Sequence, residues 1–96
     1  MTKYFISRHK GAQEWAEQQG LKFDIYLSHL DSVSIHKGDI VAGTLPVNLA
    51  AKVCEQGGHY WNLSLNLPAS ARGRELTADE LIRYGAVLEE FVVLKH

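Results

Sequence analysis

The residues best suited to chemistry lie near the start of the chain, where basic side chains follow an apolar run at 4–6. They precede residues with helical spacing, and the free N–H groups and dipole of a helix start favour an anion. No acidic residue occurs before Glu14, so the neighbouring sequence does not compensate the positive charge. We therefore predict an anion-binding corner here, with a solvated basic turn as the alternative. The corner consists of Ser7, Arg8, His9, Lys10 and Gly11.

A second candidate is His29, which follows an alternating apolar segment at 23–27 and is preceded by Ser28. Histidine is the side chain best able to move a proton near neutral pH. The alternative is a histidine that is hydrogen-bonded to a nearby backbone group. A metal centre is a further possibility, because His9, His29 and Asp31 would supply three ligands with water as the fourth. No HxxxH, CxxC or acidic pair with metal spacing is present, so the sequence favours a site without a metal.

Polar residues also follow the third predicted strand. Gly43 would let a ligand approach the backbone closely, and Thr44 would offer a hydroxyl group. Capping of the helix that starts near Pro46 is an equally good role for Thr44. The segment lacks the lysine and spacing of a P-loop, and no GxGxxG occurs, so ATPase and dinucleotide-binding functions are disfavoured. Cys54 falls on the apolar face of the same helix, where a thiol behaves as a small hydrophobe.

The last candidates follow the fourth strand. Asn66 comes directly after that strand, and Arg72 and Arg74 flank a glycine in the next loop. The planar guanidinium suits phosphate, although the adjacent Glu75 makes a surface ion pair the simpler explanation. The aromatic residues of the strand, Tyr60 and Trp61, are expected to pack in the core rather than to stack on a nucleobase.

The elements that position these residues alternate along the chain. Apolar alternation, helical spacing, glycine stops and a capping box beginning at Thr77 predict the order β-α-β-β-α-β-α-β. This order favours an α/β sandwich with a mostly parallel sheet of five strands. About eight residues is short for a parallel crossover, which favours an antiparallel second and third strand. The predicted strands span 4–7, 23–28, 39–43, 60–65 and 87–94, the last with a buried apolar end at 92–94.

In open α/β sheets, ligands bind outside the carboxyl ends of the strands. If the strands are mainly parallel, the polar residues that follow them share one edge of the sheet. The central geometric prediction is therefore that the corner at 7–10 and the corner at 43–46 lie side by side.

Composition limits the function further. The chain has 96 residues, 46% of them apolar, which predicts one ordered domain over 1–96. Ten Lys and Arg against eleven Asp and Glu argue against a protein that coats long DNA or RNA, but leave room for a small anionic ligand. A single cysteine and the lack of an apolar run of about 20 residues predict a cytoplasmic protein without a membrane segment.

Four ordered blocks resemble a known family. They are Tyr-Phe-Ile-Ser-Arg-His-x-Gly-Ala at 4–12, Ser-His-Leu-Asp at 28–31, Gly-Asp-x-Val-x-Gly-Thr-Leu-Pro at 38–46 and Arg-Gly-Arg-Glu-Leu at 72–76. The chain resembles the small CRISPR-associated Csx proteins of type III systems, in the group numbered sixteen. The resemblance runs over nearly the whole chain.

The resemblance implies a ring nuclease with a Rossmann-like (CARF-like) three-layer fold. Such a homodimer would cleave cyclic tetra-adenylate without a metal or another cofactor, by attack of the ribose 2′-OH, and so switch off type III antiviral signalling. Arg8, His9 and His29 would carry the chemistry. The ligand would be bound by Ser7, Lys10, Gly11, Ser28, Gly43, Thr44, Asn66, Arg72 and Arg74. A binding module that sequesters the ligand without cleaving it, or a protein-interaction adaptor, is the alternative.

Overall fold

The computed structural model describes residues 1–30 and 34–96, and its elements follow one another in the predicted order. One 3₁₀ turn, η1 (Ala69–Ala71), is added after the fourth strand. In the described ranges, no helix is both long enough and apolar enough to cross a membrane. The strands are β1 (Lys3–Ile6), β2 (Ile25–Leu27), β3 (Ile40–Gly43), β4 (His59–Ser64) and β5 (Val87–Phe91). The helices are α1 (Lys10–Gln18), α2 (Val47–Glu55) and α3 (Ala78–Arg83).

The five strands form one sheet in the order β2-β1-β3-β4-β5, and the first four run parallel. The expected antiparallel pairing of the second and third strands is wrong, because β1 lies between them and pairs with both. Two described residues of the connection from β2 to β3, Leu30 and Ile35, pack into the core on one face of the sheet. Both strands are shorter than predicted, so the connection covers 28–39, which reaches the dozen residues that a parallel crossover needs.

The antiparallel strand is β5, which pairs with β4. α3 has six residues and begins beyond the carboxyl end of β4. It would span about 9 Å, which is too short to carry the chain back along the sheet. The chain therefore re-enters the sheet from the carboxyl end of β4, and β5 runs back along it.

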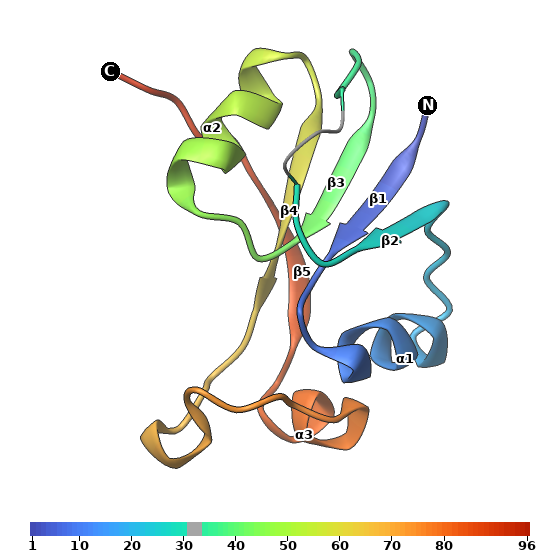
Figure 1. Cartoon of the computed structure of the whole chain (residues 1–96), viewed down its shortest axis with the longest axis vertical. Coiled ribbons are helices and arrows are strands. Elements are labelled where there is room, and N and C mark those ends of the chain that lie inside the picture. The colour runs from blue at the N-terminus through green and yellow to red at the C-terminus, as the bar shows by residue number, and fades with distance from the viewer. Residues whose placement is uncertain (31–33) are drawn as a thin grey trace.

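Helices cover both faces of the sheet, which confirms the three-layer prediction (Figure 1). Phe5, Ala42 and Leu63 pack into one core with α1 and α3. Val41 and Tyr60 of the same strands β3 and β4 pack into a second core with α2. The alternation of strand side chains therefore sends β1, β3 and β4 into both cores at once.

Two apolar patterns at the sheet edges predict the wrong burial. Ile25 of β2 is 38% exposed although it belongs to the alternating apolar set, and Tyr26 packs into the core instead. At the other edge β5 ends at Phe91, and Val92 and Leu94 are 74% and 81% exposed. Edge strands have a neighbour on one side, so apolar composition alone does not bury their side chains.

The capping box of α3 is confirmed. The Glu80 N–H donates to the Thr77 hydroxyl at 3.2 Å, and the Thr77 N–H donates to the Glu80 carboxylate at 3.1 Å. Leu76 and Leu81, the hydrophobic staple of this helix, are both buried. Arg74 pairs with the same Glu80 carboxylate at 2.5 Å.

The Arg74 guanidinium, together with the Thr77 N–H, lowers the pKa of Glu80 from 4.5 to about 2. A carboxyl whose pKa falls on folding stabilises the protein above pH 4.5, and this contribution is lost as the pH falls toward 2. We expect Arg74→Ala to flatten that acid-range loss, measured as urea unfolding midpoints between pH 5 and pH 2. The pKa of Asp39 is lowered by the N–H groups of Thr2 and His36, so this residue still makes the unfolding midpoint fall with pH in the variant.

The matched control is Arg83→Ala, which removes an exposed arginine at the end of the same helix. Its midpoints should run parallel to those of the wild type. Parallel curves for wild type and Arg74→Ala would show that this pair does not hold the Glu80 carboxylate.

Candidate functional site

The strand order reverses between β1 and β3. The chain leaves β1 through α1 toward β2 on one side, and leaves β3 through α2 toward β4 on the other. Ile6 and Gly43, the last residues of these two strands, are register partners. The corners at 7–10 and 43–46 therefore lie side by side, as predicted, at the place where open α/β sheets bind their ligands.

Gly43 makes this close approach possible. Its φ of +132° belongs to a region that side-chain-bearing residues rarely adopt, and a Cβ here would collide with the carbonyl oxygen of Ile6. Beyond Gly43, the chain passes Thr44, which is exposed, and α2 begins after Pro46. Pro46, not Thr44, is the N-cap of this helix, so the capping role considered for Thr44 is wrong.

On the β2 side of β1, several predicted residues share one cavity of about 280 Å³. It lies between the end of β1, the start of α1 and the end of β2. The Ser7 N–H donates to the carbonyl of Leu27 at 2.9 Å and so joins the two strand ends. Arg8 and Lys10 are exposed at this cavity. Its lining consists of Phe5, Ser7, Arg8, His9, Lys10, Gln13, Tyr26, Leu27 and Ser28.

His9 has a structural role that the sequence did not indicate. Its ring Nδ1 accepts a hydrogen bond of 3.0 Å from the backbone N–H of Leu76, which is buried ahead of α3. Its own backbone N–H donates to the Ser7 hydroxyl at 3.1 Å. An accepting Nδ1 requires the tautomer with the proton on Nε2. The ring therefore offers an Nε2–H donor to a ligand.

This bond gives a test of the structural role. We expect His9→Ala to lower the free energy of unfolding by about 1 to 3 kcal/mol, because the Leu76 N–H loses its acceptor. His9→Asn places an amide oxygen where Nδ1 lies and should recover most of that loss. Urea unfolding of both variants measures the difference. Equal losses in the two variants would contradict the assignment of Nδ1 as an acceptor.

The start of α1 is partly occupied by another residue of the chain. The Lys10 N–H donates to the Glu75 carboxylate at 3.0 Å, so this acid supplies the negative charge that helix starts favour. Gly11 packs against the backbone of 76–78, where a Cβ would collide with the carbonyl oxygen of Leu76. The sequence did not predict either contact, because the partners are more than 60 residues apart.

Three of the remaining candidates lie apart from this cavity, whereas His29 directly follows Ser28 of its lining. Asn66 and Arg72 line a separate cavity of about 570 Å³ beside Tyr84, and Arg74 is engaged by Glu80, not by the adjacent Glu75. His29 is exposed after β2, and Asp31 lies outside the described residues. Within 1–30 and 34–96, no three His, Cys, Asp or Glu side chains form a group that would hold a metal.

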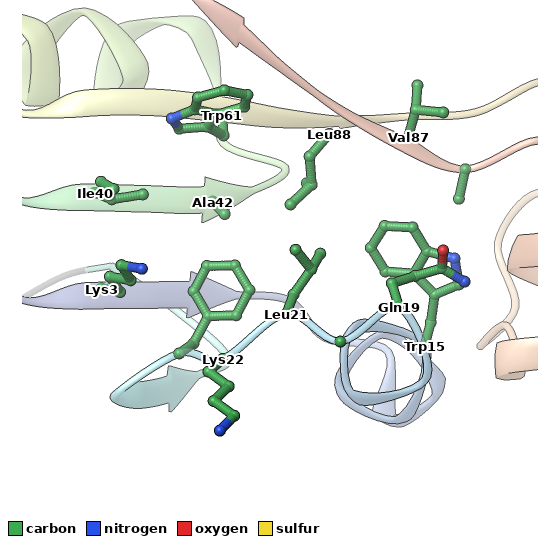
Figure 2. Close-up of a pocket in the computed structure, with 13 residues that line it drawn as sticks. Lys3, Trp15, Gln19, Leu21, Lys22, Ile40, Ala42, Trp61, Val87 and Leu88 are labelled. Carbon is green, nitrogen blue, oxygen red and sulfur yellow. The ribbon is translucent and has the colours of Figure 1, made fainter.

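A cavity of about 730 Å³ lies on the α1 face of the sheet, between the strands and the segment that ends α1 (Figure 2). Its lining is mainly apolar, with Trp15 and Trp61 among the side chains. Of its two lysines, Lys22 points away from the other lining side chains. Since the apolar lining offers few donors to a phosphate, the carboxyl edge remains the better candidate site.

One group of polar residues on the α2 face of the sheet was not predicted from the sequence. Tyr60, Asn62 and Ser64 occupy alternate positions of β4 and are joined by hydrogen bonds of 2.6 and 2.8 Å. Tyr60 is buried, as predicted, but its hydroxyl also accepts from the Leu45 N–H at 3.1 Å and so holds the turn after β3. The sequence signal that would have predicted this group is the placement of polar side chains at every second position of the strand.

Comparison with known proteins gives one family. Residues 4–94 match a family model with the description "Putative CRISPR-associated protein (Cas_VVA1548)". No curated protein and no solved structure matches the chain significantly.

Proposed function

The chain belongs to this CRISPR-associated protein family, and on this basis we propose that it is a ring nuclease that binds and cleaves cyclic oligoadenylate. The observation that carries the proposal is the meeting of the 7–10 and 43–46 corners at the reversal point of the sheet. Such a point binds ligands in open α/β sheets, and its basic and hydroxyl side chains suit a phosphate backbone. Within type III systems, cleavage of this messenger would switch off the antiviral response.

The proposed reaction uses a nucleophile that the substrate itself carries. A ribose 2′-OH attacks the adjacent phosphorus in line, the bond to the 5′ oxygen breaks, and a 2′,3′-cyclic phosphate and a 5′-OH form. The 2′ proton leaves to a base, and the 5′ oxygen takes up a proton. The protein aligns these atoms and stabilises charge on the phosphate oxygens, which are large contributions to rate.

The geometry supports a role for each of these residues. Arg8 and Lys10 stand at the cavity as exposed cations and would neutralise the phosphate charge. Ser7 and Thr44 would position it from the two neighbouring strand ends. Because the Leu76 N–H occupies Nδ1 of His9, that ring would donate from Nε2 to a phosphate oxygen, and proton transfer falls to His29.

A second copy of the chain completes the proposal. Cyclic tetra-adenylate has rotational symmetry, so a two-fold homodimer would present the same corner to opposite sides of the ring.

The test is incubation of excess purified protein with cyclic tetra-adenylate in EDTA, with products separated by chromatography. We expect linear products ending in 2′,3′-cyclic phosphate. Ligand that stays intact but binds saturably would overturn cleavage and support sequestration instead. The absence of saturable binding would favour the protein-interaction adaptor.

A further inference from the structure

The polar group on β4 is a directed chain of hydrogen bonds. It begins at the Leu45 N–H, which donates to the Tyr60 hydroxyl at 3.1 Å. It continues through Asn62 to Ser64, over contacts of 2.6 and 2.8 Å. Tyr60 is 4% exposed, and both later residues are half-buried, so the chain leads from the interior toward the carboxyl end of the strand.

The single hydroxyl proton of Tyr60 sets the direction of these hydrogen bonds. Asn62 Oδ1 lies 2.6 Å from the Tyr60 hydroxyl, and the Gly43 carbonyl oxygen lies 3.4 Å away. The shorter contact is in the range of O–H···O bonds and is short for an N–H donor, so Tyr60 donates to Asn62. Burial raises the pKa of Tyr60, which keeps its proton in place at neutral pH.

This direction leaves one donor unused at the end of the chain. With Oδ1 accepting, the Asn62 amide nitrogen faces Ser64 and donates to its hydroxyl oxygen at 2.8 Å. Ser64 therefore accepts on one side and must direct its own proton elsewhere. In the ranges 1–30 and 34–96, the Ser64 hydroxyl donates to no protein group, including the exposed Glu89 across from Asn62.

The position of Ser64 places this donor at the candidate site. Asn62 is the register partner of Gly43, the last residue of β3, so Ser64 extends two residues beyond the end of that strand. β1 and β4 flank β3 and are separated by two strand spacings, or about 10 Å. A ligand with several phosphates can contact the ends of both strands at once.

We infer that Ser64 donates a hydrogen bond to a phosphate oxygen of the nucleotide ligand, and that Asn62 and Tyr60 are positioning residues that orient its hydroxyl. The inference rests on the proposed function and extends its site from the β1 and β3 corners to β4. Hydroxyl donors of this kind fix a nucleic-acid backbone in register without reading its bases.

The test is the binding of cyclic tetra-adenylate, titrated by calorimetry in EDTA at a temperature where cleavage is slow. We expect Ser64→Ala to weaken binding about 10-fold or more, since a hydrogen bond to a charged group is lost. Ser64→Thr retains the hydroxyl and should bind within a few-fold of wild type. Ser70→Ala, which removes an exposed serine from η1, should leave binding unchanged.

A second variant tests the direction of the hydrogen bonds from Tyr60 to Ser64. In Asn62→Asp, both carboxylate oxygens accept, so the Ser64 proton turns inward and is no longer available to the ligand. Asn62→Asp should weaken binding at least as much as Ser64→Ala, and adding Ser64→Ala to it should cost nothing further. Thermal unfolding of each variant confirms that it is folded.

The outcomes separate the two proposals. A wild type that does not bind the ligand would overturn the proposed function and this assignment with it. A wild type that binds, alongside a folded Ser64→Ala that binds equally well, would overturn the assignment alone. Full additivity of Asn62→Asp and Ser64→Ala would show that Asn62 does not act through Ser64.

Discussion

Replacement of Gly43 by alanine is expected to lower the free energy of unfolding by about 2 to 6 kcal/mol. Two costs add at this residue. The backbone is held at φ +132°, which costs a residue with a side chain about 1 to 3 kcal/mol. The new Cβ would also collide with the Ile6 carbonyl oxygen, and overpacking of this kind costs about 1 to 3 kcal/mol more. Domains are stable by about 5 to 15 kcal/mol, so the variant would be close to unfolding.

The matched control is Gly73→Ala. Gly73 also has a positive φ, of +79°, but no atom lies within 4 Å of the position that its Cβ would occupy. Gly73→Ala should lower the free energy of unfolding by about 1 to 2 kcal/mol, from the backbone conformation alone. Urea unfolding followed by tryptophan fluorescence measures both variants. Equal losses at the two glycines would show that the Ile6 carbonyl oxygen does not lie against the position of a Gly43 Cβ.

The fold could be predicted from the sequence wherever the signal was local. The capping box at Thr77, the glycine stops and the helical spacing around Trp15 involve residues within a few positions of one another. Strand neighbours were harder to predict, because a loop length does not say which strand lies between two others. The crossover anchored by Ile35 and the reversal into β5 both depend on packing across the sheet.

The candidate site divides in the same way. The proximity of Gly43 to the end of β1 followed from parallel strands and required no knowledge of contacts. The engagement of the α1 start by Glu75 and of His9 by Leu76 did not follow, because α3 and the residues before it are distant in the sequence. Two candidate ligand-contacting residues, His9 and Arg74, are thus partly committed to holding the region before α3.

Arg8, by contrast, remains exposed at its cavity, and it forms no ion pair within the described part of the chain. We expect Arg8→Ala to slow cleavage of cyclic tetra-adenylate by about 100- to 1,000-fold, as does removal of one preorganised donor to a developing negative charge. Stability should change by less than about 0.5 kcal/mol, because the side chain is at the surface. Single-turnover cleavage in EDTA and urea unfolding measure the two quantities.

The size of this effect depends on where the charge lies, and Arg83→Ala tests that dependence. Arg83 is also exposed but lines neither the cavity at Arg8 nor the cavity at Arg72, so its loss changes the net charge equally without removing a group from either. A local role for Arg8 predicts near wild-type cleavage by Arg83→Ala, and partial activity for Arg8→Lys, which keeps the charge but loses the planar fork. If Arg8→Ala and His29→Ala both cleave at the wild-type rate, the chemistry lies elsewhere on the molecule, even if the activity itself is present.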